Sequence, residues 1–567
     1  MMKNIKGIKC ILLIFVYFMV IDPIIAEEKK IDYKTYDWKE KAKKFKLSKE
    51  IIKEIAENKI LVTNETYKQV FEPYIGDRKI PIFVTSDAVL NAFHVLYEES
   101  IMRMEIANIK KLKGLLNIVW NNLSTVEKSL KNAEPQLAKK AKKRAQIIIG
   151  VGLKLIGNEN IKIEEDISKI VDDEINKILA AKDVLKPDWL GKPDTGFTAL
   201  DYSRYKPRGF YTKTERLQKY FRALSWLQSI PFRVTKDEEF LSILMLGNSI
   251  ESSRIDDDVI DSIDLHYFFK VYKHFIGKKD GWDIEKAEQV NFDEIDVSEL
   301  ESMREELIED SIELERYEMI NDQIGLKNER PSIEDRIVFR ILSPYRTPDA
   351  ILFQKTTGQN RQLPSGLDIC AVLGSSFARE ELVKKNGNSI INKIEEAQKS
   401  FEGYSLYFKY LECLKELVNK PEEDAPSFMS SDIWERKSCQ TVLSGWAQLR
   451  YTWALQAKQS VTYLCASFDP VGFVEPEPEF FSKMARLTQQ TKSILNYTGA
   501  FEEDLDSLIS DIKKAIKLME NIKTNEDMKK LTNDERSFFS SMYELGYFAK
   551  SYFKEEIDDN KSLMKKY

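Results

Sequence analysis

The sequence predicts an all-α protein, a packed multi-helix globule with two long ordered loops and at most a few short strands. Apolar residues recur at intervals of three and four along most of the chain, which is the helical period. Only 22 glycines and 17 prolines occur in 567 residues, whereas many short strands would need frequent turns. Strand-like pieces are limited to ILVT at 60–63 and PIFV at 81–84.

The first residues have the pattern of an export signal. A basic segment is followed by an apolar run, CILLIFVYFMV, and the small residue Ala26 then precedes polar EEKK. We expect cleavage near Ala26, which would leave residues 27–567 secreted or periplasmic. The alternative is an uncleaved membrane anchor. No later stretch is apolar enough to span a bilayer, so the mature chain is expected to lack a transmembrane helix.

Composition limits the partners. The formal net charge is −6, which argues against a nucleic-acid binder because such proteins need a basic face. The charged stretch 285–335 is typical of a solvated helix or a surface insertion. We treat residues 27–567 as one helical domain, with a possible subdivision or insertion near 280–335.

The helical elements follow in order. Ser48 is the expected cap of a helix in 47–59, and Thr85 or Ser86 is the expected cap of a long helix after PIFV. Two stretches, 184–212 and 344–375, lack periodicity and are the predicted ordered loops, which often carry function. Further helical periods cover 110–132, 136–156, 163–182, 213–229, 237–247, 256–276, 389–419, 431–459, 477–497, 502–522 and 534–554.

Histidine chemistry has little support, because the chain has only three histidines. His94 and Glu98 are four residues apart and share a helical face, which makes them weak candidates for metal ligands. A hydrogen-bonded core histidine is the favoured interpretation. His266 and His274 are eight apart, about 80° around a helix, and make a poor ligand pair. Nucleotide-binding motifs are absent, and no cofactor is predicted.

Arginine and aromatic residues interleave in RYKPRGFYTKTERLQKYFRALSWL, residues 204–227. Aromatic faces suit sugar rings and arginine forks suit carboxylates, so this stretch is a candidate ligand groove. The favoured interpretation is an amphipathic helix whose aromatic side chains pack the core. The residues concerned are Arg208, Tyr211, Tyr220, Phe221, Arg222 and Trp226.

A long helix is predicted in 427–460. Along it Trp446, Arg450, Trp453 and Ala457 recur at helical spacing, and Lys458 and Gln459 close it. The polar members of this set are further ligand-binding candidates.

Four carboxylates are weak catalytic candidates. Glu475 and Glu477 flank Pro476, where the default role is to stabilise the start of the next helix. Paired carboxylates can also act as acid and base in glycoside hydrolysis. Asp87 and Asp368 complete the set.

Four cysteines follow the signal segment, at 370, 413, 439 and 465. They allow three pairings, and the sequence does not choose among them. One bridge and four buried thiols are equally compatible with it. None of the four has the close spacing of a zinc site.

Five motifs occur in order: PIFVTSDAVLNAFHVLYEE, YSRYKPRGFYT with YFRALSWL, PSGLDICAVLGS, SGWAQLRYTWALQAKQS and VEPEPEFF. Over about residues 60–500 the chain resembles prokaryotic exported proteins of domain-of-unknown-function family 3160. The resemblance implies an exported, helix-rich protein and no particular activity. Residues that match the family pattern are Asp87, His94, Arg208, Gly209, Tyr211, Gly366, Asp368, Trp446, Arg450, Lys458, Gln459 and Glu475.

Four positions depart from that pattern. The family motif Arg-Gly-His-Tyr has Phe210 as its third residue here. The motif Trp-Ala-Glu-Leu-Arg-His-Asp has Gln448, Tyr451 and Thr452 at its other ionisable positions. If those groups form a site in the family, this chain should lack it.

Three functions are therefore considered. The favoured one is an exported, non-catalytic binding protein with an Arg/aromatic groove for a small glycan, a peptide or an envelope protein. The second is a hydrolase or lyase acting on cell-envelope polysaccharide or peptide, and the third is a structural or assembly protein. A single site would bring Asp87, Arg208, Asp368, Lys458 and Glu475 around one pocket.

Overall fold

A computed structural model describes most of the helical core. The signal segment, His266, Lys458, Gln459, Cys465 and the predicted strand at 60–63 lie outside the described residues. The described residues are 49–58, 82–158, 161–194, 196–251, 272–290, 295–315, 332–357, 361, 364–421, 425–453, 472–475, 477–498 and eight positions between 505 and 517.

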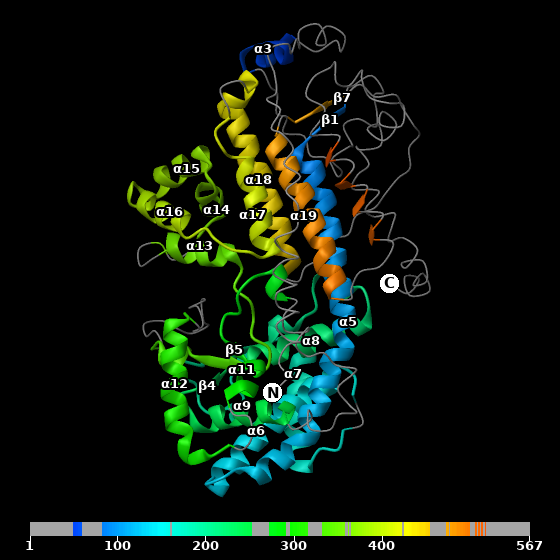
Figure 1. Ribbon diagram of the computed structural model, residues 1–567, viewed down its shortest axis with the longest axis vertical. Coiled ribbons are helices and arrows are strands. Elements are labelled where there is room, and N and C mark those ends of the chain that lie inside the picture. Colours follow the sequence, from blue (N-terminus) through cyan, green and yellow to red (C-terminus); the bar gives the residue numbers. More distant parts are fainter. Residues whose placement is uncertain are drawn as a thin grey trace, which may run out of the picture.

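Helices dominate the structure, and the all-α prediction is confirmed (Figure 1). No helix in the described part of the chain combines the length and apolar character needed to cross a membrane. The helices are α3 (Lys49–Asn58), α5 (Ser86–Ser129), α6 (Pro135–Leu155), α7 (Glu165–Ala180), α8 (Glu215–Ser229), α9 (Asp237–Glu251), α11 (Ile284–Val290), α12 (Leu300–Glu313), α13 (Pro348–Thr356), α14 (Gly366–Leu373), α15 (Ser376–Asn386), α16 (Ser389–Lys399), α17 (Leu406–Glu416), α18 (Asp432–Trp453) and α19 (Pro478–Tyr497).

The strands are two or three residues long and hold segments together rather than forming a layer. β1 (Ile82–Val84), at the predicted PIFV, pairs in parallel with β7 (Gly472–Val474). The other pairings are β2 (Val184–Leu185) with β3 (Leu200–Asp201), and a three-stranded sheet in the order β4 (Phe232–Arg233), β6 (Val338–Arg340), β5 (Trp282–Asp283).

Helix α5 runs through the whole molecule. Figure 1 shows it passing from the group that holds α13–α19 into the group that holds α6–α12. Its 44 residues span about 66 Å. Thr85, one of the two predicted caps, is its N-cap residue, but its side chain makes no capping hydrogen bond. The separate helical run predicted for 110–132 is the second half of this helix, because no proline interrupts the chain between the two runs.

Two other predictions differ in detail. The run 389–419 forms two helices, α16 and α17, because Ser405 caps α17 by accepting a hydrogen bond from the Phe408 amide at 3.2 Å. The stretch 344–375, predicted as a loop, contains the short helices α13 and α14. Helices of eight or nine residues complete about two turns, so their periodicity is weak.

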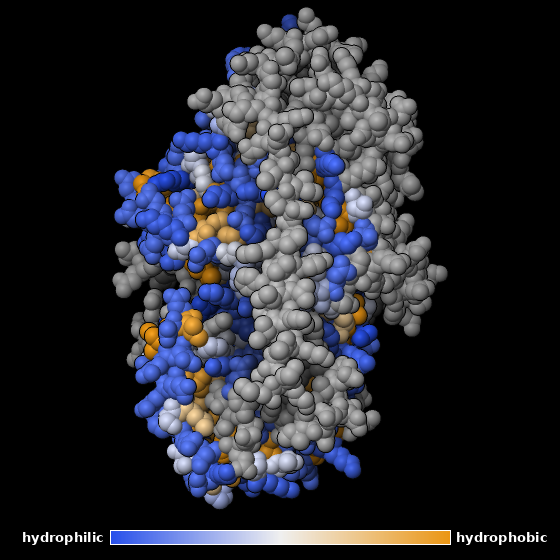
Figure 2. All heavy atoms as spheres, viewed as in Figure 1, coloured by the Kyte–Doolittle hydropathy of each residue, from blue (hydrophilic) through white to orange (hydrophobic). Residues whose placement is uncertain are grey.

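Aromatic residues fill the core between the helices. Trp226 of α8 is fully buried and donates a hydrogen bond from Nε1 to the carbonyl oxygen of Ile148 at 2.9 Å. Figure 2 shows that hydrophobic residues on the described part of one face form small, separate patches on a mostly hydrophilic surface. The apolar residues are therefore chiefly inside, as in other globular proteins.

Gly247 allows α9 and α11 to touch backbone to backbone. A Cβ at this position would lie 2.5 Å from the carbonyl carbon of Ala287 and from the amide nitrogen of Glu288. We expect Gly247→Ala to lower the free energy of unfolding by about 1–3 kcal/mol, because a main chain cannot rotate away from the clash. Urea denaturation would measure it. Gly150→Ala is the control, since its nearest contact is a Val171 methyl group at 3.3 Å; an equal loss in both variants would contradict the argument.

Candidate functional site

Three predicted carboxylates come together where β1 and β7 end. Because these strands are parallel neighbours, Asp87 and Glu475 leave the same edge, and Glu477 follows two residues after Glu475. Lys437 of α18 lies among them. Its Nζ donates to Glu475, and Glu475 also accepts a hydrogen bond from the Ser86 amide at the start of α5. Glu475 is almost fully buried.

The environments of these carboxyl groups differ. Burial raises the pKa of Asp87, Lys437 opposes this effect, and Glu475 adds to it. Burial and the neighbouring Glu475 raise the pKa of Glu477 well above its usual range. Lys437 keeps its charge, because the surrounding carboxylates outweigh burial and raise its pKa. The cluster therefore holds one carboxylate that is paired with a lysine, Glu475, and one carboxyl group whose raised pKa favours the protonated form, Glu477.

The fourth candidate, Asp368, has a different setting. It lies in the first turn of α14, and its side chain accepts hydrogen bonds from the Ser365 amide at 2.7 Å and from both terminal nitrogens of Arg361 at 2.5 and 2.6 Å. Despite burial, these contacts lower the pKa of Asp368. This residue completes a capping box and holds Arg361 in place.

His94 and Glu98 share a face of α5, as the spacing predicts. His94 Nε2 lies 3.8 Å from Glu98 Oε2, and Lys213 Nζ lies 3.9 Å from Glu98 Oε1. Tyr451, one of the four departures from the family pattern, is also near: burial and then Glu98 raise its pKa. Within the described residues, no three His, Cys, Asp or Glu side chains are grouped so that they could hold a metal ion.

The aromatic residues of 204–227 pack the core. Tyr211, Tyr220, Phe221 and Trp226 are each at most 2% exposed, so they cannot line an open groove. Their burial agrees with the other interpretation from the sequence, an amphipathic helix whose aromatic side chains pack the core. Their arginine neighbours Arg208 and Arg222 are partly buried.

Tyr211 belongs to a buried network that the sequence did not predict. Its hydroxyl donates to Glu105 Oε1 at 2.8 Å, and Tyr272 donates to Oε2 at 2.7 Å. Tyr220 hydrogen-bonds to Tyr272 at 3.2 Å. Burial raises the pKa of Glu105, and the three tyrosine hydroxyls partly offset this. The only signal for Glu105 in the sequence is an acidic residue on an otherwise apolar helical face.

Trp446 and Arg450, two predicted ligand-binding residues, both bind Asp349. Trp446 Nε1 donates to Asp349 Oδ2 at 2.9 Å, and Arg450 donates to the same oxygen. Asp349 is fully buried at the start of α13, whereas the Arg450 side chain is 43% exposed. The pair joins α18 to α13 and leaves one side of the guanidinium open.

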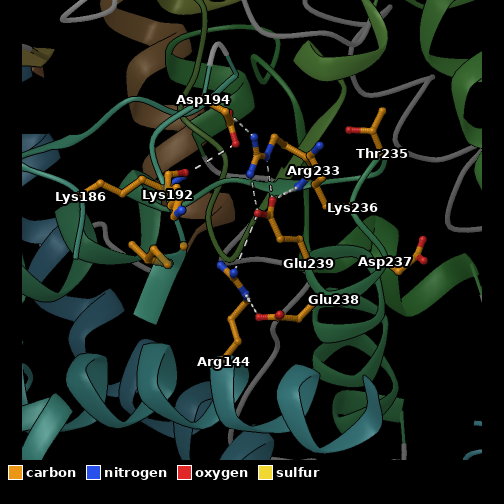
Figure 3. Close-up of a pocket in the computed structure, with 12 residues that line it drawn as sticks. Arg144, Lys186, Lys192, Asp194, Arg233, Thr235, Lys236, Asp237, Glu238 and Glu239 are labelled. Atoms are coloured by element: carbon orange, nitrogen blue, oxygen red, sulfur yellow. Dashed lines mark hydrogen bonds and ion pairs between the residues drawn. The ribbon is translucent and has the colours of Figure 1, made fainter. Parts of the chain in front are cut away.

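A charged cleft of about 450 Å³ lies between α6, the chain after β2, and the start of α9 (Figure 3). None of its residues was selected individually from the sequence, although Lys186, Lys192 and Asp194 lie in the predicted loop 184–212. Figure 3 shows Arg144 pointing from α6 toward Glu239, with Arg233 and Asp194 on the opposite side. The residues that line the cleft are Arg144, Lys186, Leu190, Gly191, Lys192, Asp194, Arg233, Thr235, Lys236, Asp237, Glu238 and Glu239.

Ion pairs connect the arginines and the carboxylates that line the cleft. Arg233 forms a two-pronged pair with Glu239, at 2.9 Å from Nε and 2.6 Å from Nη2, and its Nη1 donates to Asp194 at 2.5 Å. Arg144 Nε donates to Glu238 at 2.9 Å. Lys186 is the third cation of these ion pairs, and its buried Nζ lies 3.9 Å from the Asp194 carboxylate. Burial lowers the pKa of Lys186.

Positive charge remains after this pairing. Arg144 is only 6% exposed, yet its Nη1 has no hydrogen-bond partner among the described residues. The exposed Lys192 and Lys236 at the mouth form no ion pair within the described part of the chain. The acidic Asp237 at the mouth is paired with Arg304. The site is therefore suited to an anion.

Comparison with known proteins identifies the family. Residues 48–566 match the family described as protein of unknown function (DUF3160). The chain belongs to this family. The resemblance found in the sequence motifs is thus confirmed, and the DUF3160 match extends beyond the 60–500 over which they occur. No curated protein and no solved structure gives a significant match.

The Lys437–Glu475 pair should contribute strongly to stability. The side chains are 15% and 0% exposed, and removing one partner of a buried pair typically costs about 3–5 kcal/mol. We expect this loss for Lys437→Met in urea denaturation, and a smaller loss for Lys437→Met combined with Glu475→Gln, which leaves no unpaired charge. The half-buried pair Lys483–Glu416 is the control. A double variant as unstable as the single one would argue against an uncompensated buried charge.

Glu477 should contribute stability at acidic pH that is lost as the pH rises. Because folding raises the pKa of Glu477, the folded state binds more protons than the unfolded state, and this contribution is lost as the pH rises through the raised value. Glu477→Gln should therefore increase the melting temperature relative to the wild type, by more at pH 7 than at pH 5. Glu479→Gln, an exposed change in the next helix, is the control. An unchanged pH profile in Glu477→Gln would contradict the assignment.

Proposed function

We propose that this protein is an exported, non-catalytic binding protein that takes up a small anionic ligand in the cleft between α6 and α9. The ligand class is a carboxylate or phosphate compound. Arg144 carries the proposal: a buried guanidinium with one nitrogen that has no partner among the described residues. Export is inferred from the N-terminal segment, with its basic start, apolar run and Ala26.

The size and lining of the cleft support a small polar ligand. Small-molecule sites occupy roughly 300–1,000 Å³, and this cleft measures about 450 Å³. Most such sites are largely apolar, whereas charged residues dominate here. A charged ligand can replace the water that these groups would otherwise bind, and an uncharged apolar ligand cannot.

The arrangement of charges favours an anion over a cation. The carboxylates of the cleft are already engaged by arginines: Glu239 and Asp194 by Arg233, and Glu238 by Arg144. An incoming cation would have to compete with these pairs. An incoming carboxylate or phosphate can accept hydrogen bonds from Arg144 Nη1 and from the lysines at the mouth without breaking one.

The proposed binding site is the cleft between α6 and α9 and not the groove expected at residues 204–227. The arginines of the proposed site are Arg144 and Arg233 rather than Arg208 and Arg222, and the aromatic side chains of 204–227 lie in the core. The substrates considered from the sequence, a glycan or a peptide, fit the cleft through their acidic groups. A uronic acid or a peptide carboxylate carries the required charge.

Binding can be tested by titrating the full chain with inorganic phosphate, and separately with malonate, at constant ionic strength. A ligand that binds only the folded state raises the melting temperature in a saturable way. We expect Arg144→Gln to weaken the affinity by about 10–100-fold, since a hydrogen bond to a charged group contributes about 1.5–3 kcal/mol. Preference for phosphate or malonate would separate the two ligand classes.

Two further variants keep this test decisive. Lys236→Gln removes an exposed charge at the mouth and should weaken binding severalfold without affecting the fold. Arg379→Gln removes a surface arginine that pairs with Glu395, and should leave binding unchanged. If the wild-type protein shows no saturable rise, or if Arg144→Gln binds as well as the wild type, the protein is better regarded as a structural or assembly protein.

One observation favours a second function, a hydrolase or lyase acting on cell-envelope polysaccharide or peptide. Asp87, Glu475 and Glu477 gather around Lys437, and burial raises the pKa of Asp87 and of Glu477, as a general acid requires. We rank it second because Glu475 already binds the start of α5. Release of reducing ends from purified peptidoglycan, lost in Glu477→Gln, would support it, and no release would exclude that substrate.

A further inference from the structure

Two cysteines from distant parts of the chain meet in the core. Cys370 lies in α14 and Cys439 in α18, and both side chains are at most 1% exposed. Cys370 Sγ lies 3.7 Å from the carbonyl oxygen of Cys439. Each thiol also affects the other: the Cys439 thiol is the main cause of the raised pKa of Cys370, and the Cys370 thiol is the main cause of the lowered pKa of Cys439.

The third described cysteine has different neighbours. Cys413 is buried in α17, and the ionisable groups around it are Lys483, Glu412, Glu416 and Arg486 rather than a thiol. A disulfide forms only between cysteines whose Cα atoms lie within about 7 Å and whose side chains face one another, so the helices that carry them must pack together, as α14 and α18 do. Among the described cysteines, geometry thus selects one pair.

We propose that Cys370 and Cys439 form a disulfide bond that joins α14 to α18 in the exported protein. The pairing follows from the packing of α14 against α18, while its formation in the cell rests on the proposed export to an oxidising compartment. From the sequence alone, the four cysteines are compatible with three pairings, and none of these is favoured.

The reaction needs a disulfide compound as oxidant, for example oxidised glutathione. The thiolate of one cysteine attacks this disulfide, forms a mixed disulfide and releases one glutathione thiolate. The second cysteine thiolate then attacks the protein sulfur, closes the Cys370–Cys439 bond and releases the other glutathione thiolate. The two protein thiols lose two protons and two electrons, and one glutathione disulfide is reduced to two thiols.

Burial determines when this exchange can occur. Both sulfurs are covered in the folded protein, so glutathione reaches them only before α14 and α18 have packed or when they separate.

The disulfide bond would close a loop between positions 69 residues apart. It would tie the α13–α16 group to the long helix α18, which also anchors the start of α5 through Lys437.

The full chain should be refolded from denaturant in a buffer of reduced and oxidised glutathione, alkylated, digested and analysed by mass spectrometry without reduction. The expected result is a cross-linked Cys370–Cys439 peptide as the main disulfide, with Cys413 alkylated. Free, alkylated Cys370 and Cys439 would overturn the proposal, and so would a dominant pairing of either residue with Cys413 or Cys465.

Thermal stability provides a second readout, in which each protein is compared with itself in the presence and absence of a reductant. The melting temperature of the oxidised wild-type protein should fall by several degrees when a reductant is added. This reductant effect should vanish in Cys370→Ala and in Cys439→Ala and persist in Cys413→Ala. A reductant effect that is retained in Cys439→Ala, or absent from the wild type, would overturn the proposal even if the cross-linked peptide were detected in trace amounts.

Discussion

The length of α5 is the constraint on which the rest of the structure depends. A helix of about 66 Å with apolar residues on several sides cannot remain exposed to water, so other helices must cover it along its whole length. Helices α18 and α19 cover its first part, and α6 and α9 cover its second part. Two groups of helices that are distant in sequence become one molecule because they share this partner.

Polar contacts fix the position of α5 within that apolar surround. Glu475 receives the amide of Ser86 at its start, and Asn122 donates to the carbonyl oxygen of Ser249 at 2.9 Å near its end. Between them, Glu105 accepts from tyrosines of two other segments. Apolar packing tolerates small shifts, but a buried carboxylate without its donors is costly, so these contacts specify one height and one rotation of the helix.

The sequence predicted what depends on local pattern. The helical period located most helices, Thr85 was recognised as a cap, and Asp87, Glu475 and Glu477 were selected as chemically relevant carboxylates. Lys437 was missed because its role depends on the pairing of β1 with β7, whose partner residues lie 390 positions apart in the sequence. The cleft was missed because Arg144 and Arg233 lie 89 positions apart on different elements, and neither has a local motif. Burial of the aromatic residues at 204–227 agrees with the amphipathic helix that the sequence favoured, whereas the partners they pack against could not be identified from periodicity.

The pairing of β1 with β7 has a consequence for how the chain matures. β1 leaves the ribosome 390 residues before its partner Gly472 exists, which at roughly 5–20 residues per second corresponds to about 20–80 seconds. During that interval the start of α5 lacks the carboxylate that binds Ser86, and the apolar side chains of its first half lack α18 and α19. A nascent chain of this protein therefore has a long period in which its central helix is open to chaperones, to other chains and to proteases.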